Sequence, residues 1–159
     1  MIVTLSGVTG TGKSFFKNVI SQELNFKNLA IVTTRNKRDG ETNGIDKEFV
    51  SEEKFEELKK ENKVVVSFEF LGSKYAYRKK DLESEESQVT ELHYDTIYEF
   101  KKNAQNVFSI YMIPKDLERA KKELRKRNLP KEIEEKRLKE IDEHIKEYNS
   151  NIDLQNQFD

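Results

Sequence analysis

Short apolar runs alternate with helix-like stretches at both ends of the chain. Ile2–Leu5 and Leu29–Thr33 are typical of strands, and Val107–Ile113 is apolar at nearly every position, which predicts a strand covered on both faces. From Lys13 to Asn25 the apolar residues recur at helical spacing, at Phe16, Val19, Ile20 and Leu24. Strands that alternate with helices predict an α/β fold with a parallel sheet flanked by helices.

The second half of the chain continues this alternation. A weaker strand is expected over Val89–Leu92 and a helix over Asp95–Lys102. Two charged helices follow, over Lys115–Arg127 and Lys131–Tyr148, separated by a proline. We expect a last short strand at Ile152–Gln155.

The middle of the chain, from about residue 35 to residue 78, has the pattern of β structure. Val64–Phe70 is the clearest strand, Gly72 marks a turn, and Tyr75 and Tyr77 fall on the returning strand. Ser51 suits the N-cap of a short helix that carries its apolar side chains inward. The sequence therefore predicts a small β-rich insertion within one domain.

Composition excludes several classes of function. With 29 basic and 30 acidic residues the net charge is −1, so bulk attraction to nucleic acid or to an anionic membrane is not expected. The chain has no cysteine, which excludes disulfides and thiolate metal sites, and only two histidines. No apolar run approaches the roughly 20 residues of a membrane helix, and no secretory signal is visible. We expect a cytoplasmic protein.

One motif predicts a nucleotide-phosphate site. Residues 7–14, GVTGTGKS, match the phosphate-loop pattern G-x-x-x-x-G-K-[ST]. Glycines let successive backbone N–H groups converge on phosphate oxygens, and the next helix presents its positive N-terminus. Lys13 would reach the β- and γ-phosphates, and the Ser14 hydroxyl would bind Mg²⁺. The expected phosphate-binding residues are Gly7, Thr9, Gly10, Thr11, Gly12, Lys13, Ser14 and Phe15.

A second loop, residues 33–46, carries two arginines three positions apart. Arg35 and Arg38 lie on a segment that Gly40 and Gly44 make flexible. Such a pair can clamp another phosphate in fork-shaped geometry. From composition alone, an ordinary solvated loop explains the segment equally well.

With these two segments the chain resembles the guanylate kinase family. The likeness rests on SGVTGTGKS, TTRNKRDGETNGIDKEFVS, the GSKY turn at residues 72–75 and LRKRNLPKEIEEKRL, and it runs from about residue 2 to residue 156. It implies one domain with a P-loop NTPase-type core (about 1–34 and 79–159), a lobe for the nucleoside monophosphate (about 35–78) and a helical lid within about 119–140. It also implies transfer of the γ-phosphoryl group of ATP–Mg²⁺ to a nucleoside monophosphate, by default GMP or dGMP.

The resemblance implies roles for five residues at the acceptor. Arg35 and Arg38 would grip the acceptor phosphate, and Tyr75 would donate its hydroxyl to it. Glu41 matches a glutamate that contacts the nucleotide in the family. Glu91 falls near an acidic strand end that contacts Mg²⁺ or the acceptor.

Two further arginines match those of the family's lid. By resemblance, Arg127 and Arg137 would join Lys13 as the catalytic cations that face the transferred phosphoryl group. On a helical wheel Arg137 falls inside the apolar arc of its helix. A side chain placed there either extends to the rim of the core or points into a cleft, and the resemblance favours the cleft.

The departures from the family concentrate where it recognises guanine. Ile31 lies where a serine is usual, Tyr77 replaces another serine, and Lys47 replaces a tyrosine that touches the acceptor phosphate. Val66 aligns with a glutamate that takes the N–H donors of guanine, and Glu69 should lie on the opposite strand face. Losing that carboxylate removes a strong means of discrimination, because a wrong base would leave it unpaired.

Three functions therefore stay open at the level of sequence, and a generic P-loop ATPase or GTPase is disfavoured because the pair Arg35 and Arg38 would then have no role. The first is a guanylate kinase-like enzyme, and the second is the same chemistry on another ribo- or deoxynucleoside monophosphate. The third is a non-catalytic module that binds a nucleotide or a phosphorylated partner, against which the intact Lys13 and Ser14 argue. The histidine near the expected cleft, His93, is a candidate for a polar contact.

Overall fold

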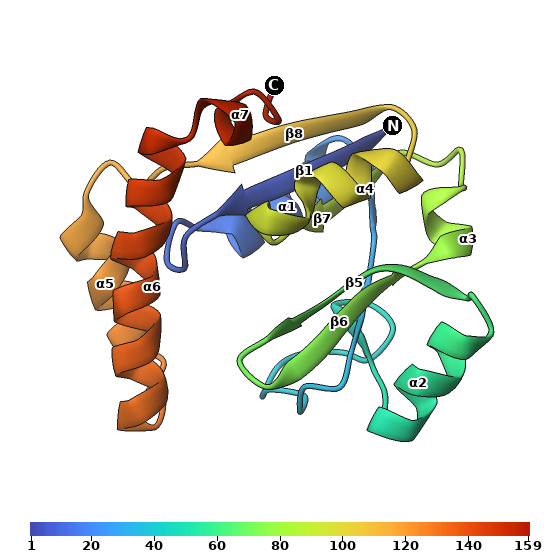
Figure 1. Ribbon diagram of the computed structural model, residues 1–159, viewed down its shortest axis with the longest axis horizontal. Coiled ribbons are helices and arrows are strands. Elements are labelled where there is room, and N and C mark those ends of the chain that lie inside the picture. The colour runs from blue at the N-terminus through green and yellow to red at the C-terminus, as the bar shows by residue number, and fades with distance from the viewer.

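A computed structural model describes residues 1–159 and contains a parallel core sheet (Figure 1). Its order is β2-β7-β1-β8, and all neighbouring strands run parallel. The strands are β1 (Ile2–Gly7), β2 (Lys27–Asn28), β7 (Gln88–Glu91) and β8 (Val107–Met112). The α/β fold with a parallel sheet that the sequence predicts is thereby confirmed.

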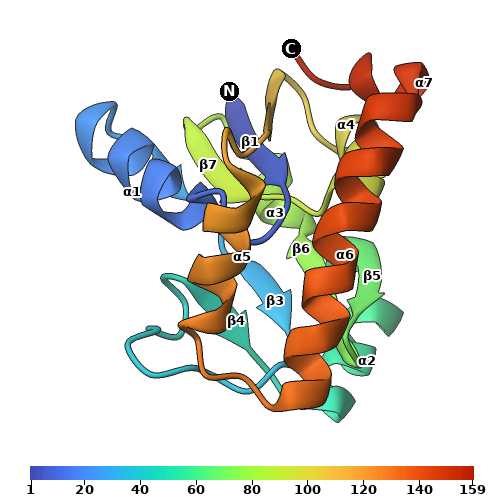
Figure 2. The same ribbon diagram turned by 90° about the vertical axis from the view of Figure 1, so that its left-hand side faces the viewer.

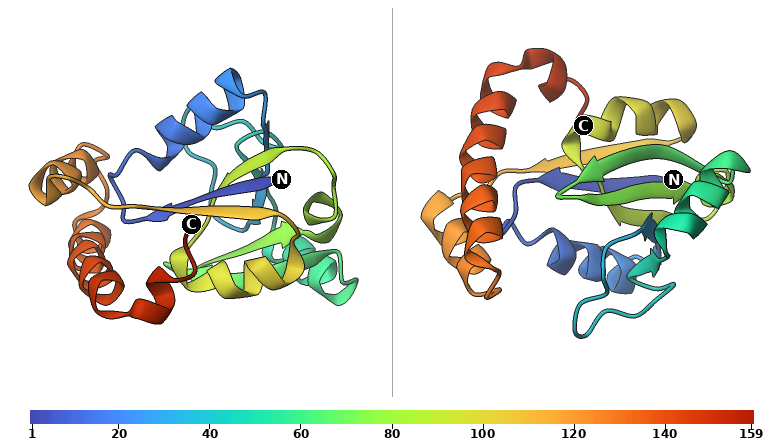
Figure 3. Two further views of the ribbon diagram at one scale, coloured as in Figure 1. Left: turned by 90° about the horizontal axis from the view of Figure 1, so that it is seen from above. Right: turned by 60° about the horizontal axis from the view of Figure 1, so that its bottom comes forward.

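Helices cover the two faces of this sheet, as the left panel of Figure 3 shows for α1 (Lys13–Glu23) and α4 (Ile97–Asn103). Side chains alternate along β1, so Val3 faces the cluster that includes Ile20 of α1, and Ile2 faces the cluster of α4. The core sheet is thus held between two apolar layers, and its strands end together at one edge.

A second sheet, ordered β4-β3-β6-β5, forms a smaller lobe. Its strands are β3 (Ile31–Thr33), β4 (Lys47–Phe49), β5 (Val64–Phe70) and β6 (Ser73–Arg78). Strands β3 and β4 are parallel, whereas β6 runs antiparallel to both β3 and β5. Helix α2 (Glu52–Lys60) covers one face through Phe55 and Leu58, and Ser51 caps it by accepting a hydrogen bond from the backbone N–H of Lys54 (3.2 Å).

The other face of the second sheet packs against the core. Ile31, Val66 and Tyr77 belong to the same buried cluster as Ile2 and Phe100 of the core domain. Tyr77 is fully buried, and its hydroxyl donates to the carbonyl oxygen of Glu91 (2.9 Å). Both sheets therefore share one hydrophobic core, which fixes the lobe against the ends of β1 and β7.

Two helices stand beside this core, at the end opposite α2 in Figure 1, and Figure 2 shows them side by side. They are α5 (Leu117–Arg125) and α6 (Lys131–Ser150), and Pro130 precedes the second. Leu124 and Ile141 pack with Val8 of the loop after β1, which ties this helical pair to the phosphate loop. The short elements are α3 (Lys79–Leu82), the 3₁₀ turn η1 (Tyr94–Thr96) and α7 (Ile152–Gln155).

The expected final strand is wrong, because residues 152–155 form helix α7. The Asn151 side chain accepts a hydrogen bond from the backbone N–H of Leu154 (3.0 Å), and Asp153 lies in the first turn. An asparagine cap with an acidic first turn favours a helix, and this local preference wins over the short apolar pattern.

The prediction that both faces of β8 are covered holds only in part. Val107 packs against the cluster of α4, and Ile110 and Met112 pack against the cluster of α1. Strand β8 is an edge strand that pairs only with β1, and Phe108 and Ile113 are 45% and 54% exposed. At its free edge, Asp159 donates its backbone N–H to the Ser109 carbonyl and accepts the Ser109 N–H on its carboxylate, both at 2.8 Å. An apolar run predicts a strand but does not show which neighbours it has.

Two expectations near the N-terminus need correction. In α1 the predicted apolar stripe is only partly inward, since Phe16 and Leu24 are exposed while Lys17 is buried. The expected strand at Leu29–Thr33 is shorter than predicted, because only Ile31–Thr33 form β3 of the second sheet, and β2, which pairs with β7 in the core sheet, ends before it at Asn28. The second sheet therefore includes residues before position 35. No helix is long and apolar enough to cross a membrane.

Candidate functional site

A cleft of about 730 Å³ lies where the phosphate loop, the second sheet and the α5–α6 helices meet. Every residue to which the sequence assigned a role lines it, except Thr11. Those lining residues are Gly7, Thr9, Gly10, Gly12, Lys13, Ser14, Phe15, Arg35, Arg38, Glu41, Tyr75, Glu91, Arg127 and Arg137. Thr11 instead donates its hydroxyl to the Val8 carbonyl (2.9 Å) and so holds the loop in shape.

Packing demands glycine at two positions of the phosphate loop. Gly7 has φ +126°, and a Cβ there would collide with the backbone carbonyl of Met112 at the end of β8. Gly10 has φ +87°, and its Cβ would collide with the Ala120 carbonyl of α5. The missing side chains let the loop pass close to both elements and turn into α1.

Lys13 spans the phosphate loop from inside. Its ammonium donates to the carbonyl oxygens of Gly7 and Val8, both at 2.8 Å. Burial lowers the pKa of Lys13 to about 8, and the nearby positive charges of Arg127 and Arg137 add to this. Helix α1 begins at Lys13 without a side-chain cap, so its first N–H groups are free for an anion.

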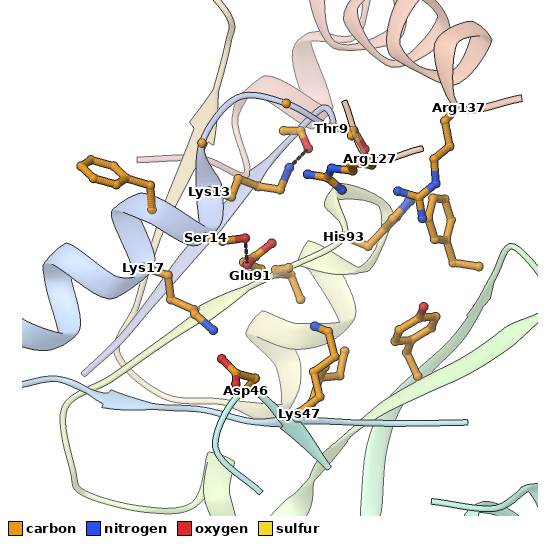
Figure 4. A pocket seen from close by; sticks show the side chains of 18 of the residues that line it. Thr9, Lys13, Ser14, Lys17, Asp46, Lys47, Glu91, His93, Arg127 and Arg137 are labelled. Atoms are coloured by element: carbon orange, nitrogen blue, oxygen red, sulfur yellow. Dashed lines mark hydrogen bonds between the residues drawn. The ribbon is translucent and has the colours of Figure 1, made fainter. Parts of the chain in front are cut away.

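Ser14 and Glu91 place two oxygens together at the floor of the cleft (Figure 4). The Ser14 hydroxyl donates to Oε1 of Glu91 at 2.7 Å. Burial alone would raise the pKa of Glu91, but the charges of Lys47 and Lys13 hold it below its usual value. Mg²⁺ prefers such hard oxygen ligands and takes few of them from protein, so this pair fits the ion. No group of three or more acidic or histidine side chains forms a preassembled metal site.

Arg35 and Arg38 use their charges differently. The Arg35 guanidinium binds both carboxylate oxygens of Glu41 (2.7 and 2.9 Å), and Glu41 also accepts the backbone N–H of Arg38 (2.7 Å). Glu41 thereby shapes the arginine loop from within. The Arg38 side chain has no carboxylate partner, and burial, with the charge of Arg35, lowers its pKa. Its guanidinium is therefore available to an anion.

The α5–α6 helices contribute Arg127 and Arg137. The sequence expectation that Arg137 lies on the inward face of its helix is confirmed, since it is only 9% exposed and lines the cleft. Its guanidinium lies 5.9 Å from the centre of the Phe70 ring, and its Nε has no hydrogen-bond partner. Burial lowers the pKa of Arg137, as do the charges of Arg38 and Arg127. An anion between these arginines would relieve their repulsion.

Sequence reasoning missed Lys17, which is buried and lines the cleft. Figure 4 shows Lys17 of α1 and Lys47 of β4 directed toward the region of Glu91. Lys17 follows Lys13 by one helical turn, and this i, i+4 spacing could have identified it. Phe68, Phe70 and His144 also line the cleft without having been assigned a role, and His93, the candidate for a polar contact, lines it as well.

At two of the positions that depart from the family, the side chain belongs to the hydrophobic core. Val66, at a bulge of β5 with φ +53°, and Tyr77 are buried and do not line the cleft, whereas Ile31 does. Glu69 lies opposite Lys74 in the register of β5 and β6, and Lys74 forms an ion pair with Glu56 of α2, so Glu69 is on the side of the sheet that faces α2. Neither Val66 nor Glu69 therefore places a carboxylate in the cleft.

Comparison with known proteins agrees with this geometry. A family model described as guanylate kinase matches residues 1–159. The guanylate kinase of Malacoplasma penetrans is 30% identical over 169 residues, which cover 99% of this chain and 82% of that protein. The guanylate kinase of Rickettsia prowazekii is 31% identical over 132 residues, covering 80% of this chain and 67% of that protein.

A solved structure shares the fold. The guanylate kinase from Anaplasma phagocytophilum is similar with a TM-score of 0.65 at 24% identity, over 77% of this chain and 64% of that chain. The chain thus spans about two thirds of the solved protein and of the Rickettsia relative. By its matching model, its relatives and its cleft, the chain belongs to the guanylate kinase family of ATP-dependent nucleoside monophosphate kinases.

Proposed function

We propose that this protein transfers the γ-phosphoryl group of ATP to a nucleoside monophosphate, with GMP or dGMP as the acceptor that the family implies. One observation carries the proposal. The phosphate loop with Lys13 and the loop with Arg38 face the same cleft from two sides, and Arg127 and Arg137 line it as well. A single phosphate site would not need both groups of cations.

The phosphate loop would hold the donor. The free N–H groups at the start of α1 and the ammonium of Lys13 suit the β- and γ-phosphates. Ser14, beside Glu91, would hold Mg²⁺. The ion, when bound, neutralises charge on the phosphate oxygens.

The second sheet would hold the acceptor. Arg38 offers a guanidinium without an internal partner, and Arg35 is kept in place by Glu41. Tyr75 on β6 also lines the cleft, and its hydroxyl would be a further donor. These donors suit the phosphate of a nucleoside monophosphate.

In the transfer step an oxygen of the acceptor phosphate bonds to the γ-phosphorus while the bond from that phosphorus to the β,γ-bridging oxygen breaks. ADP leaves with that bond's electron pair, and a nucleoside diphosphate forms. Such reactions depend on positioning and on charge neutralisation. Lys13, Arg127 and Arg137 supply positive charge from the phosphate loop and the lid, and they require no histidine base.

A second candidate is the same reaction on another base. Val66 and Tyr77 contribute to the hydrophobic core, so neither offers guanine a polar group in the cleft. This observation leaves phosphate recognition intact and changes only the preferred acceptor.

A coupled assay of ADP release tests the proposal. The wild-type chain is supplied with ATP–Mg²⁺ and, in turn, with a panel of ribo- and deoxynucleoside monophosphates. We expect turnover with at least one purine monophosphate and its loss in Lys13→Ala, while Lys37→Ala, which changes an exposed neighbour of Arg38 that does not line the cleft, stays active. ATP binding without turnover of any acceptor would favour a nucleotide-binding module.

A further inference from the structure

Four aromatic rings form one wall of the cleft, which we call the aromatic wall: Phe68, Phe70, Tyr75 and His93. The rings of Phe68 and Tyr75 are stacked across the β5–β6 pair, with centres 5.2 Å apart and planes 13° apart. The imidazole of His93 lies 5.1 Å from Phe70 and 5.7 Å from Phe68, centre to centre. Such a wall suits the flat ring of a nucleotide base, because it offers apolar faces for stacking.

The carboxylates that line the cleft already interact with other groups of the protein. Glu41, Asp46 and Glu91 each accept a hydrogen bond from within the protein. Glu123 and Glu140 come from the α5–α6 helices, where Glu123 pairs with Lys126 and Glu140 offsets the charge of Arg137. A base that lies on the aromatic wall would thus meet mostly donors, such as Arg38 and Lys47.

His93 is the exception, because its Nε2 atom is buried and has no hydrogen-bond partner. Buried polar atoms are paired in most proteins, so an unpaired one on the wall of a cleft calls for a ligand group. Its other nitrogen, Nδ1, lies 3.4 Å from Oδ2 of Asp95. A carboxylate at Nδ1 favours the tautomer with the proton on that atom, and Nε2 then keeps its lone pair.

The position of His93 is fixed by its surroundings. It follows β7, and its carbonyl accepts hydrogen bonds from the backbone N–H (3.0 Å) and the hydroxyl (2.7 Å) of Thr96 in η1. The ring stacks on Tyr94 with centres 5.1 Å apart and meets His144 of α6 edge-on at 5.8 Å.

We propose that Nε2 of His93 accepts a hydrogen bond from an N–H group on the base of the acceptor nucleotide. His93 is then a specificity-determining residue, and it provides a hydrogen-bond acceptor in a cleft where Val66 and Tyr77, two of the positions at which the family recognises guanine, belong to the hydrophobic core. This inference rests on the proposed function, since it requires a nucleoside monophosphate as acceptor. It adds the selection of the base to that function.

Two variants and two acceptors test the inference. His93→Phe keeps an aromatic ring but removes the lone pair, whereas His93→Asn restores an acceptor oxygen. The acceptors are GMP and purine riboside 5′-monophosphate, which has the same ring system without an N–H on its six-membered ring. Equilibrium Kd and steady-state KM and kcat are measured for each acceptor, and KM is measured for ATP.

We expect His93→Phe to raise the Kd and KM of GMP about tenfold or more, the usual effect of leaving one buried donor unpaired. The values for purine riboside monophosphate and the KM of ATP should change less than about twofold. His93→Asn should recover part of the loss with GMP. The matched control His144→Phe, made on the neighbouring ring, should affect both acceptors in the same proportion.

Other results would overturn the inference. An equal loss with both acceptors in His93→Phe would show that the ring only supports packing, and an unchanged GMP affinity would show that water satisfies Nε2. If the wild type binds and phosphorylates GMP but the His93 variants change the constants of GMP and of purine riboside monophosphate equally, the proposed function stands and the assignment of His93 is wrong. If the wild type neither binds nor phosphorylates any nucleoside monophosphate, both fall.

Discussion

Lys13 gives the cleft its clearest dependence on pH at the scale of a residue. In the free protein its pKa is lowered to about 8, chiefly by burial, so the ammonium loses its proton as the pH rises through 8. ATP phosphates favour the charged form, so binding above pH 8 takes up a proton. We expect the Kd of ATP to be nearly constant below pH 7.5 and to rise by up to about tenfold per pH unit above 8.

Titration calorimetry in two buffers of different ionisation enthalpy checks both the affinity and the proton uptake. Lys13→Arg is the control, because a guanidinium keeps its charge throughout this range and should give a nearly flat profile. A wild-type profile as flat as that of the arginine variant would contradict the role assigned to the lysine charge.

Substitution of Arg38 should weaken binding of the acceptor nucleotide and leave binding of ATP nearly unchanged. Its guanidinium is free of internal carboxylates, and Glu41 orients its backbone. Removing a charged donor to phosphate costs about 1.5–3 kcal/mol, so Arg38→Ala should raise the acceptor KM roughly 10- to 100-fold. The KM of ATP should stay within about twofold, and Lys37→Ala serves as a matched control. Equal increases in the two KM values would refute an acceptor-side role.

At the scale of an element, features that depend on one segment could be predicted from the sequence, whereas the pairing of strands with one another could not. The cap at Ser51, the hairpin that carries Tyr75 and the inward Arg137 all follow from spacing along one segment, and the structure confirms them. The edge position of β8 and the placement of Ile31–Thr33 in a second sheet, apart from the neighbouring β2, depend on pairing between distant segments. A single sequence does not encode such pairing in its periodicity.

Ser51 provides a test of element stability in the small lobe. Its hydroxyl satisfies one of the free N–H groups of α2, and Phe55 and Leu58 of that helix are buried against the sheet. Ser51→Ala should lower the free energy of unfolding by about 1 kcal/mol in urea titrations, whereas Ser51→Asp, which also caps helices, should lower it far less. Equal losses in both variants would show that the cap contributes nothing measurable.

At the scale of the molecule, the site is built from parts that are distant in the sequence. Residues of the phosphate loop and the arginine loop could be identified because each lies in a compact motif. From the sequence His93 was only a candidate for a polar contact, because its aromatic neighbours come together only where β7, β5 and α6 converge on one cleft. The burial of Val66 and Tyr77 in the core could not be predicted from the sequence either, because a valine or tyrosine in a strand pattern can face either side of the sheet.

Because these segments meet at one cleft, their positive charges lie close together and repel one another when no ligand is bound. Lys13, Arg38, Arg127 and Arg137 come from three separate parts of the fold, and burial together with the neighbouring positive charges lowers the pKa of Lys13, Arg38 and Arg137. Anionic ligands should therefore stabilise the molecule as a whole, and a donor and an acceptor bound together should stabilise it further. At about 100 times its Kd, one ligand adds about 2.7 kcal/mol, which raises Tm by about 5–10 °C in a domain of this size.

Thermal unfolding with a non-hydrolysable ATP analogue, with GMP, and with both measures this effect. We expect each ligand alone to raise Tm and the pair to raise it at least additively, because the two phosphate groups bind different cations of one cleft. In Arg38→Ala the increase caused by GMP should disappear while that caused by the ATP analogue remains, and in Lys13→Ala the reverse should hold. If both variants lost both responses, the two groups of cations would form a single anion site, and transfer between two bound nucleotides would no longer describe this cleft.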